Sequence, residues 1–118
     1  MYRIAAALVV CVGCGTTEDD RPQTLENVTM TILAPACGNA QCHSSFRQEN
    51  GYAFDTVEAA KESIEDGGLV NPGDSEGSLL HIVLVRNVDR MPWDQPLADP
   101  DIGLIRAWID NGADGIEP

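Results

Sequence analysis

The chain has few basic residues and no long hydrophobic run. Seven Lys and Arg stand against nineteen Asp and Glu, which gives a formal net charge of −12. This charge argues against a nucleic acid or an anionic lipid surface as a binding partner. The apolar run at residues 4–12 is too short for the roughly twenty residues that a membrane-spanning helix needs.

Other absences limit the class of fold and activity. No segment alternates between polar and apolar residues for long enough to predict a β-strand, and there are no internal repeats. The two histidines and the scattered carboxylates show no spacing that is typical of a catalytic constellation. The sequence therefore gives no indication of hydrolysis or group transfer.

Residues 1–13 have the pattern of an export signal, because the basic Arg3 precedes the short apolar run. A small residue and then Cys14 follow, so this segment resembles the leader of a bacterial lipoprotein. The resemblance implies a lipid on Cys14 and an exported protein in the periplasm or cell envelope. An ordinary cleaved leader is the alternative.

Gly15, directly after the lipidation site, is not an acidic retention residue, which favours the outer membrane. The polar, charged segment that follows predicts a flexible tether over residues 14–22. Residues 23–115 are then expected to form one small domain.

Four segments show apolar residues at helical spacing, bounded by residues that cap or break helices. The expected bounds are Pro22 and Pro35, Asp55 and Gly67-Gly68, Ser75 or Ser78 and Val85, and Asp99-Pro100 and Gly112. The residues expected to face the core are Leu25, Val28, Ile32, Leu33, Val57, Ala60, Ile64, Leu79, Ile82, Val83, Val85, Ile102, Ile105, Trp108 and Ile109. We therefore predict a small all-α domain of about four short helices with long loops, whose modest core a large planar cofactor would complete.

The segment from Cys37 to His43 has a pattern that is typical of covalent haem attachment, with two nearby thiols and a His directly after Cys42. Each thiol would bind a vinyl group, and the imidazole would be the first axial ligand of the iron. Four residues separate the cysteines where two are usual, so the segment must bulge. Gly38 and Asn39 suit a bulge because both tolerate positive φ. The same residues also fit a disulfide or a zinc site.

Met91 is the candidate for the second axial ligand, because a thioether suits haem iron and Pro92 stiffens the backbone beside it. Met30 lies too close to the cysteines in sequence to reach the opposite face of a haem. His81 is the rival sixth ligand. A gap-filling role of Met91 in the core is the other interpretation.

Arg90 and Trp93 flank this methionine and are candidates for hydrogen bonds to haem propionates. Trp108 is expected to be a core aromatic on the last helix.

From Leu25 to about Ala113 the order of these motifs resembles the small bacterial cytochrome c-like domains. The matching residues are Cys37, Cys42-His43, Asn71-Pro72-Gly73-Asp74, Ser78-Leu79-Leu80, Arg90-Met91-Pro92, Trp108-Ile109 and Gly112-Ala113. The resemblance implies a cytochrome c-like fold and one covalent haem c, with Cys37 and Cys42 as thioether anchors, His43 as proximal ligand and Met91 as distal ligand. The wide spacing of the cysteines departs from the usual pattern of the family.

With protein ligands on both sides of the iron, electron transfer is favoured over catalysis. We therefore expect a lipid-anchored electron carrier, with a redox partner protein whose basic patch would dock on the acidic surface. The alternative is a haem-free binding or structural module of the same fold, closed by a Cys37–Cys42 disulfide.

Overall fold

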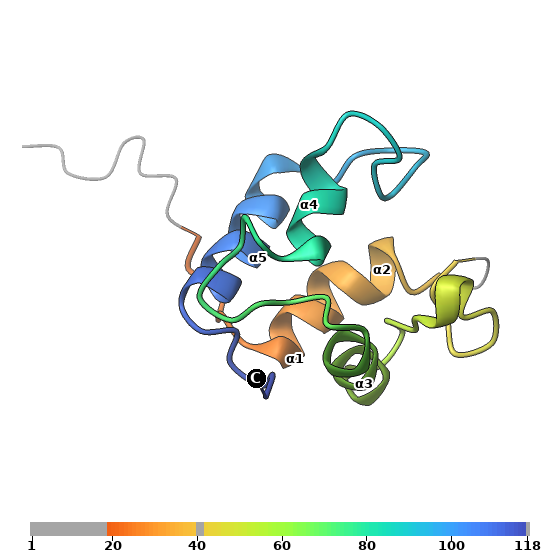
Figure 1. Cartoon of the computed structure of the whole chain (residues 1–118), viewed down its shortest axis with the longest axis horizontal. Helices are drawn as coiled ribbons and strands as arrows, with labels where there is room; N and C mark the ends of the chain where they lie inside the picture. The colour runs from red at the N-terminus through yellow and green to blue at the C-terminus, as the bar shows by residue number, and fades with distance from the viewer. Residues whose placement is uncertain (1–18, 40–41, 118) are drawn as a thin grey trace, which may run out of the picture.

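The computed structural model describes residues 19–39 and 42–117, so the expected leader, the lipidation site at Cys14 and most of the tether lie outside it. Within these ranges the polypeptide forms helices and loops and no β-strand (Figure 1). No helix there has both the length and the apolar character needed to cross a bilayer.

The first helix consists of three consecutive elements. These are α1 (Leu25–Val28), a π-helical segment η1 (Thr29–Leu33) and α2 (Ala34–Ala36). Thr24 is the N-cap, and its side-chain oxygen accepts a hydrogen bond of 3.1 Å from the N–H of Asn27.

The expected bounds of this helix are wrong at both ends. Pro22 precedes it without opening it, since Thr24 supplies the oxygen that caps the first turn. Pro35 lies inside α2 instead of stopping the helix. In the π-helical turn before it, Ala34 donates to the carbonyl of Thr29 five residues back. This wider turn accommodates the proline ring and its missing N–H.

The remaining helices are α3 (Val57–Gly67), α4 (Leu79–Val85) and α5 (Asp99–Asp110), with a short 3-10 turn η2 (Glu49–Gly51) before α3. Counting α1, η1 and α2 as one, the described residues form four helices and a compact all-helical domain. The predicted fold class is confirmed.

The start of α3 differs from the expectation by one residue. Thr56, not Asp55, is the N-cap, and its Oγ1 accepts from the N–H of Ala59 at 3.1 Å. The Asp55 carboxylate instead accepts from Ser45, whose N–H lies at 2.8 Å and whose hydroxyl lies at 2.7 Å. Asp55, which we expected to cap the helix, therefore binds the loop that contains Ser45.

The ends of α4 and α5 follow the predicted pattern with one shift. Ser78 is the N-cap residue of α4. Ala98 is the N-cap of α5, so that Asp99 is already the first helical residue. Gly112 follows α5 with φ of +109°, which fits a glycine stop signal.

The core lies where α1 and η1 meet α3 and where α4 meets α5. Most predicted core residues on the first, second and fourth helices are buried, and Trp108 has no exposed surface. The face of α4 is the exception. Leu79 and Val85 are 44% and 50% exposed, whereas Leu80 and Leu84 enter the core. Because nearly every residue of this helix is apolar, its periodicity does not single out the buried face.

Candidate functional site

Two loops frame a cavity at one end of the molecule. The first loop follows α2, and the second connects α4 to α5; Figure 1 shows both on the side away from the C-terminus. The cavity between them has a volume of about 650 Å³. Its lining residues are Ala36, Cys37, Asn39, Cys42, His43, Glu49, Asn50, Met91, Pro92, Trp93 and Asp94.

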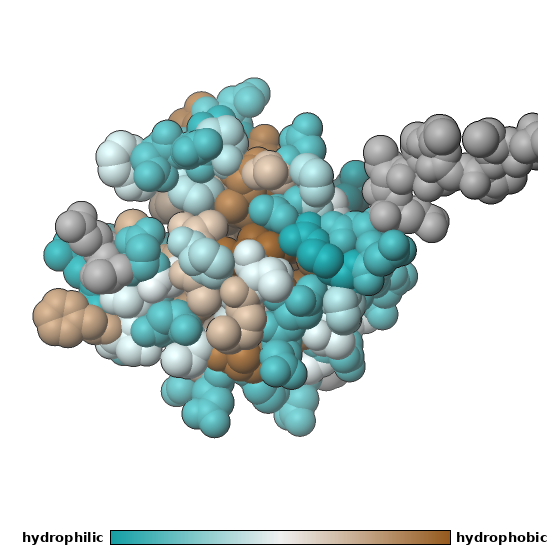
Figure 2. All heavy atoms as spheres, turned by 180° about the vertical axis from the view of Figure 1, so that it is seen from behind, coloured by the Kyte–Doolittle hydropathy of each residue, from teal (hydrophilic) through white to brown (hydrophobic). Residues whose placement is uncertain are grey.

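A second, largely apolar cavity of about 380 Å³ adjoins the first and shares Cys37, His43, Asn50 and Met91 with it. Leu79 and Val83 of α4 contribute to its wall. Volumes of several hundred Å³ are typical of sites for small molecules and cofactors. From behind, Figure 2 shows apolar residues exposed in the middle of a surface that is otherwise mostly hydrophilic.

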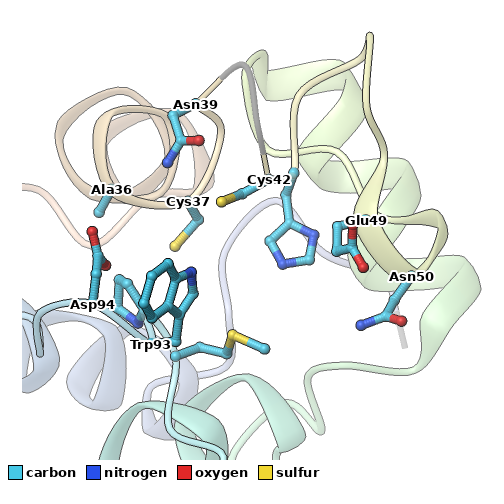
Figure 3. A pocket seen from close by; sticks show the side chains of 11 residues that line it. Ala36, Cys37, Asn39, Cys42, Glu49, Asn50, Trp93 and Asp94 are labelled. Carbon is cyan, nitrogen blue, oxygen red and sulfur yellow. The ribbon is translucent and has the colours of Figure 1, made fainter.

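The two thiols come together because the chain turns directly after α2. Cys37 ends the helix, where its N–H donates to Leu33 O at 2.8 Å. Cys42 follows the turn, and its N–H donates to Asn39 O at 3.1 Å. Figure 3 shows both sulfur atoms at the same cavity, with Trp93 across from them. Both cysteines are free thiols.

Gly38 has a different role from the one expected. It does not have positive φ; a Cβ added to it would lie 2.7 Å from the backbone nitrogen of Asp55. The glycine is therefore needed because the segment around Phe54 and Asp55 passes so close to the turn. This contact holds the loop of the two cysteines against the start of α3.

The Cys37 thiol is partly buried and packs against the core cluster. Burial raises its pKa to about 11, and the neighbouring Cys42 adds a smaller increase. In this environment the raised pKa keeps the thiol protonated at neutral pH. Among residues 19–39 and 42–117, no group of three His, Cys, Asp or Glu side chains is placed to hold a metal ion.

His43 is fixed by its backbone and by two aromatic rings. Its N–H donates to Cys37 O at 3.0 Å, and its carbonyl accepts from Phe54 N–H at 2.6 Å. Its ring meets that of Phe54 edge-on at 5.3 Å and that of Tyr52 at 6.3 Å. The Nδ1 atom is buried without a hydrogen-bond partner. The imidazole is thus oriented toward the cavity by packing.

Met91 reaches the same two cavities from the loop after α4. Its N–H donates to the carbonyl of Val83 at 2.7 Å, which fastens the loop back onto the helix. The methionine and His43 are the only candidate axial ligands that the structure places at the cavity among the described residues.

The other predicted residues are distributed as follows. His81 is buried on α4, interacts with the charge of Asp110, and lines neither cavity. Met30 is 55% exposed and also lines neither. Trp93 is 79% exposed at the cavity edge. Arg90 is half-buried beside Met91, and its Nε is buried without a hydrogen-bond partner.

Several lining residues were not predicted from the sequence. They include the aromatic residues Tyr52 and Phe54 and the polar residues Glu49 and Asn50. The alternation of the two aromatic residues around Ala53 was a signal that this segment is partly buried. Leu79 was expected to pack in the core, but it faces the cavity.

The residues at the cavity fit a covalently bound haem. Two thiols and an imidazole line it together with a thioether, which is the donor set for attachment and axial ligation of the iron. The apolar wall with Leu79 and Val83 is left uncovered by protein, as expected where a flat apolar cofactor binds.

Comparison with known proteins gives the same assignment. Residues 40–94 match the family profile described as Planctomycete cytochrome C. The matched range includes Cys42, His43 and Met91 and begins after Cys37. No match was found among curated proteins or among solved structures. The chain therefore carries a domain of the Planctomycete cytochrome C family over residues 40–94.

Proposed function

We propose that this protein transfers single electrons through one haem c, with Cys37 and Cys42 as thioether anchors and His43 and Met91 as axial ligands. One observation carries the proposal. Two distant segments of the chain bring both thiols, the imidazole and the thioether to one cavity. Membership of a cytochrome c family supports the same function.

The haem would supply a one-electron ferrous–ferric couple when bound. The protein contributes the surroundings of that couple. Packing by Tyr52 and Phe54 presets the imidazole of His43, and the Met91–Val83 hydrogen bond positions the thioether. With both axial positions filled by side chains, exchangeable ligands and substrates are excluded from the iron.

The remaining polar groups complete the proposed site. Arg90 would donate its buried Nε–H to a propionate, and the Trp93 indole at the cavity edge would donate to the second propionate or cover the cofactor. His81 is disfavoured as an axial ligand, since its side chain lines neither cavity.

We further propose export to the periplasm or cell envelope and a lipid anchor at Cys14 in the outer membrane. The basic and apolar leader with a cysteine directly after Gly13 supports this. Membership of a c-type cytochrome family fits an extracytoplasmic location.

Expression in a periplasm that contains the haem-attachment machinery tests the proposal. We expect sharp visible bands in the reduced protein, and haem that stays with the polypeptide after denaturation. A colourless protein without free thiols would instead support the disulfide-closed, haem-free module. In the structure the two thiols are not joined.

The axial ligand is tested by Met91→Ala, which should abolish the weak sulfur-to-iron absorption of the ferric protein. Met30→Ala is the matched control, because Met30 is exposed and remote from the cavity. His81→Ala should also leave the band unchanged. Persistence of the band in the Met91 variant would show that another residue binds the iron.

A further inference from the structure

Exposed apolar side chains are concentrated around the cavity. The large hydrophobic residues exposed in the described part of the chain are Met30, Phe46, Leu79, Val85, Val88 and Trp93. All except Met30 belong to two segments, residues 42–54 and 79–94, which also supply most of the cavity lining. Leu79 faces the cavity, whereas Phe46 and Val88 are 95% and 74% exposed and line none of it.

The same two segments carry no net charge. Three basic and three acidic residues occur in them, namely Arg47, Arg86, Arg90, Glu49, Asp89 and Asp94. Because these charges cancel, the whole formal charge of −12 falls on the rest of the chain. The two segments therefore carry balanced charges, with Asp55 held against Ser45 beside the first of them, and the rest of the chain is strongly acidic.

The loops that carry these residues project from one end of the molecule, away from the C-terminus (Figure 1). The cavity lies between them, since residues of both loops line it. Exposed aromatic residues are typical of the centre of a protein interface, and balanced charges add no net repulsion toward a partner.

We propose that Phe46, Val88 and Trp93 form a docking surface for a redox partner protein that presents an uncharged, apolar patch at its own redox centre. The inference rests on the proposed electron-transfer function and specifies its partner. It takes the place of the expected basic docking patch, because the two segments that carry these side chains have no net negative charge to attract one.

Charge also argues against two other binding partners for this surface, a second copy of the chain and an anionic membrane. A second copy of the chain would bring together two molecules that each carry a net charge of −12, and their repulsion opposes association. An anionic membrane would be repelled for the same reason. A weakly charged protein partner meets no such repulsion.

The test uses reduced, haem-loaded protein and two small copper proteins as electron acceptors. One acceptor has apolar, uncharged residues around its copper site, and the other has a ring of lysines there. Stopped-flow mixing at low and high salt gives the second-order rate constants. We expect faster transfer to the apolar acceptor, with little dependence on salt.

The double variant Phe46→Ser/Val88→Ser should lower the rate constant with the apolar acceptor at least about tenfold, because interface centres depend on a few apolar anchors. Met30→Ser, which removes an exposed apolar side chain that lines neither cavity, should leave it unchanged. An unchanged rate in the double variant, or a faster and strongly salt-dependent reaction with the lysine-ringed acceptor, would overturn the proposal. Self-association that the double variant abolishes would do so too, because a second copy would then be the occupant.

The visible spectrum recorded before mixing shows whether the electron-transfer proposal or only the docking proposal has failed. If the haem bands are absent, the proposed electron-transfer function fails. The docking surface is then tested on the haem-free chain by NMR titration with the apolar acceptor. Chemical-shift changes at Phe46 and Val88 that the double variant loses support docking, and unchanged shifts exclude it.

Discussion

The two tryptophans of the chain lie in contrasting surroundings. Trp108 on α5 is completely buried, and its Nε1–H donates to Asp114 O at 3.0 Å. Trp93 is 79% exposed at the edge of the cavity. The same contrast separates two regions of the molecule. Around α5 the apolar side chains are buried against other parts of the protein, whereas beside α4 and the two loops some apolar side chains stay exposed. The first region is covered by protein, and the proposed haem would cover the second.

The largest effect is expected from Trp108→Ala. Removing this buried ring and its hydrogen bond should lower the free energy of unfolding of the haem-free chain by about 3–5 kcal/mol. Trp93→Ala should change it by no more than about 0.5 kcal/mol, because the ring is exposed. Urea titrations followed by circular dichroism measure both values. Comparable losses in the two variants would remove the distinction between the regions.

The reactivity of the Cys37 thiol shows how far the buried region extends toward the cavity. With its pKa raised to about 11 from an ordinary 9.0, Cys37 should carry about a hundredfold less thiolate at neutral pH than an ordinary thiol. In the reduced, haem-free chain, its alkylation by iodoacetamide should be slower by a similar factor than in urea. Mass spectrometry of the Cys37 peptide gives the rate. Equal rates in the folded and the unfolded chain would mean that the thiol is not buried.

Leu79 and Leu84 of α4 both line the apolar cavity but differ in burial, since Leu79 is 44% exposed and Leu84 is 2% exposed. This difference allows a direct test of the uncovered wall. Leu79→Ser should hardly change the stability of the haem-free chain, but should cost the haem-loaded protein about 1–2 kcal/mol, because the proposed haem would bury this cavity-lining side chain. Leu84→Ala should cost about 2–5 kcal/mol in both forms, because this leucine is only 2% exposed. Denaturant titration of both forms checks the difference. If Leu79→Ser weakened both forms alike, the cavity would be part of the ordinary core.

The smallest effect concerns the pH dependence of the loop that holds His43. The Ser45 N–H and hydroxyl lower the pKa of Asp55 below its ordinary 3.8. This carboxylate therefore stabilises the fold at pH values above 3.8, and its contribution is lost as the pH falls through the lowered pKa. Asp55→Asn should be less stable than the wild type at neutral pH, and the difference should shrink in acid. Unfolding curves at a series of pH values measure it; a constant difference would show that the ionised carboxylate is not what matters.

The fold was predictable because its signals are local. Apolar spacing located all four helices, and Gly68 and Gly112 follow α3 and α5 as expected. The starts were less certain, because a short polar residue such as Asp55 can cap a helix or bind a distant backbone. Pro35 is a similar case, since a π-helical turn lets the helix continue past it.

The site was predictable where neighbours in sequence are also neighbours in the cavity. The cysteines and His43 were recognised from their order alone, and Met91 from the proline beside it. Tyr52 and Phe54 were missed because their function depends on contact with the His43 ring, which no local pattern encodes. The sequence also could not show that the side chains of Phe46 and Val88 are exposed on the two loops that frame the cavity.

The sequence by itself determined which segments become helices and which side chains are candidates for binding a cofactor, because capping, periodicity and donor type are properties of short stretches. Only the tertiary structure decided that the thioether of Met91 shares a cavity with the two thiols, and that Leu79 faces this cavity and not the core. The physical reason is that the sequence of a helix shows that it has an apolar face to bury. The arrangement of all the helices determines whether other protein segments or a cofactor would bury that face.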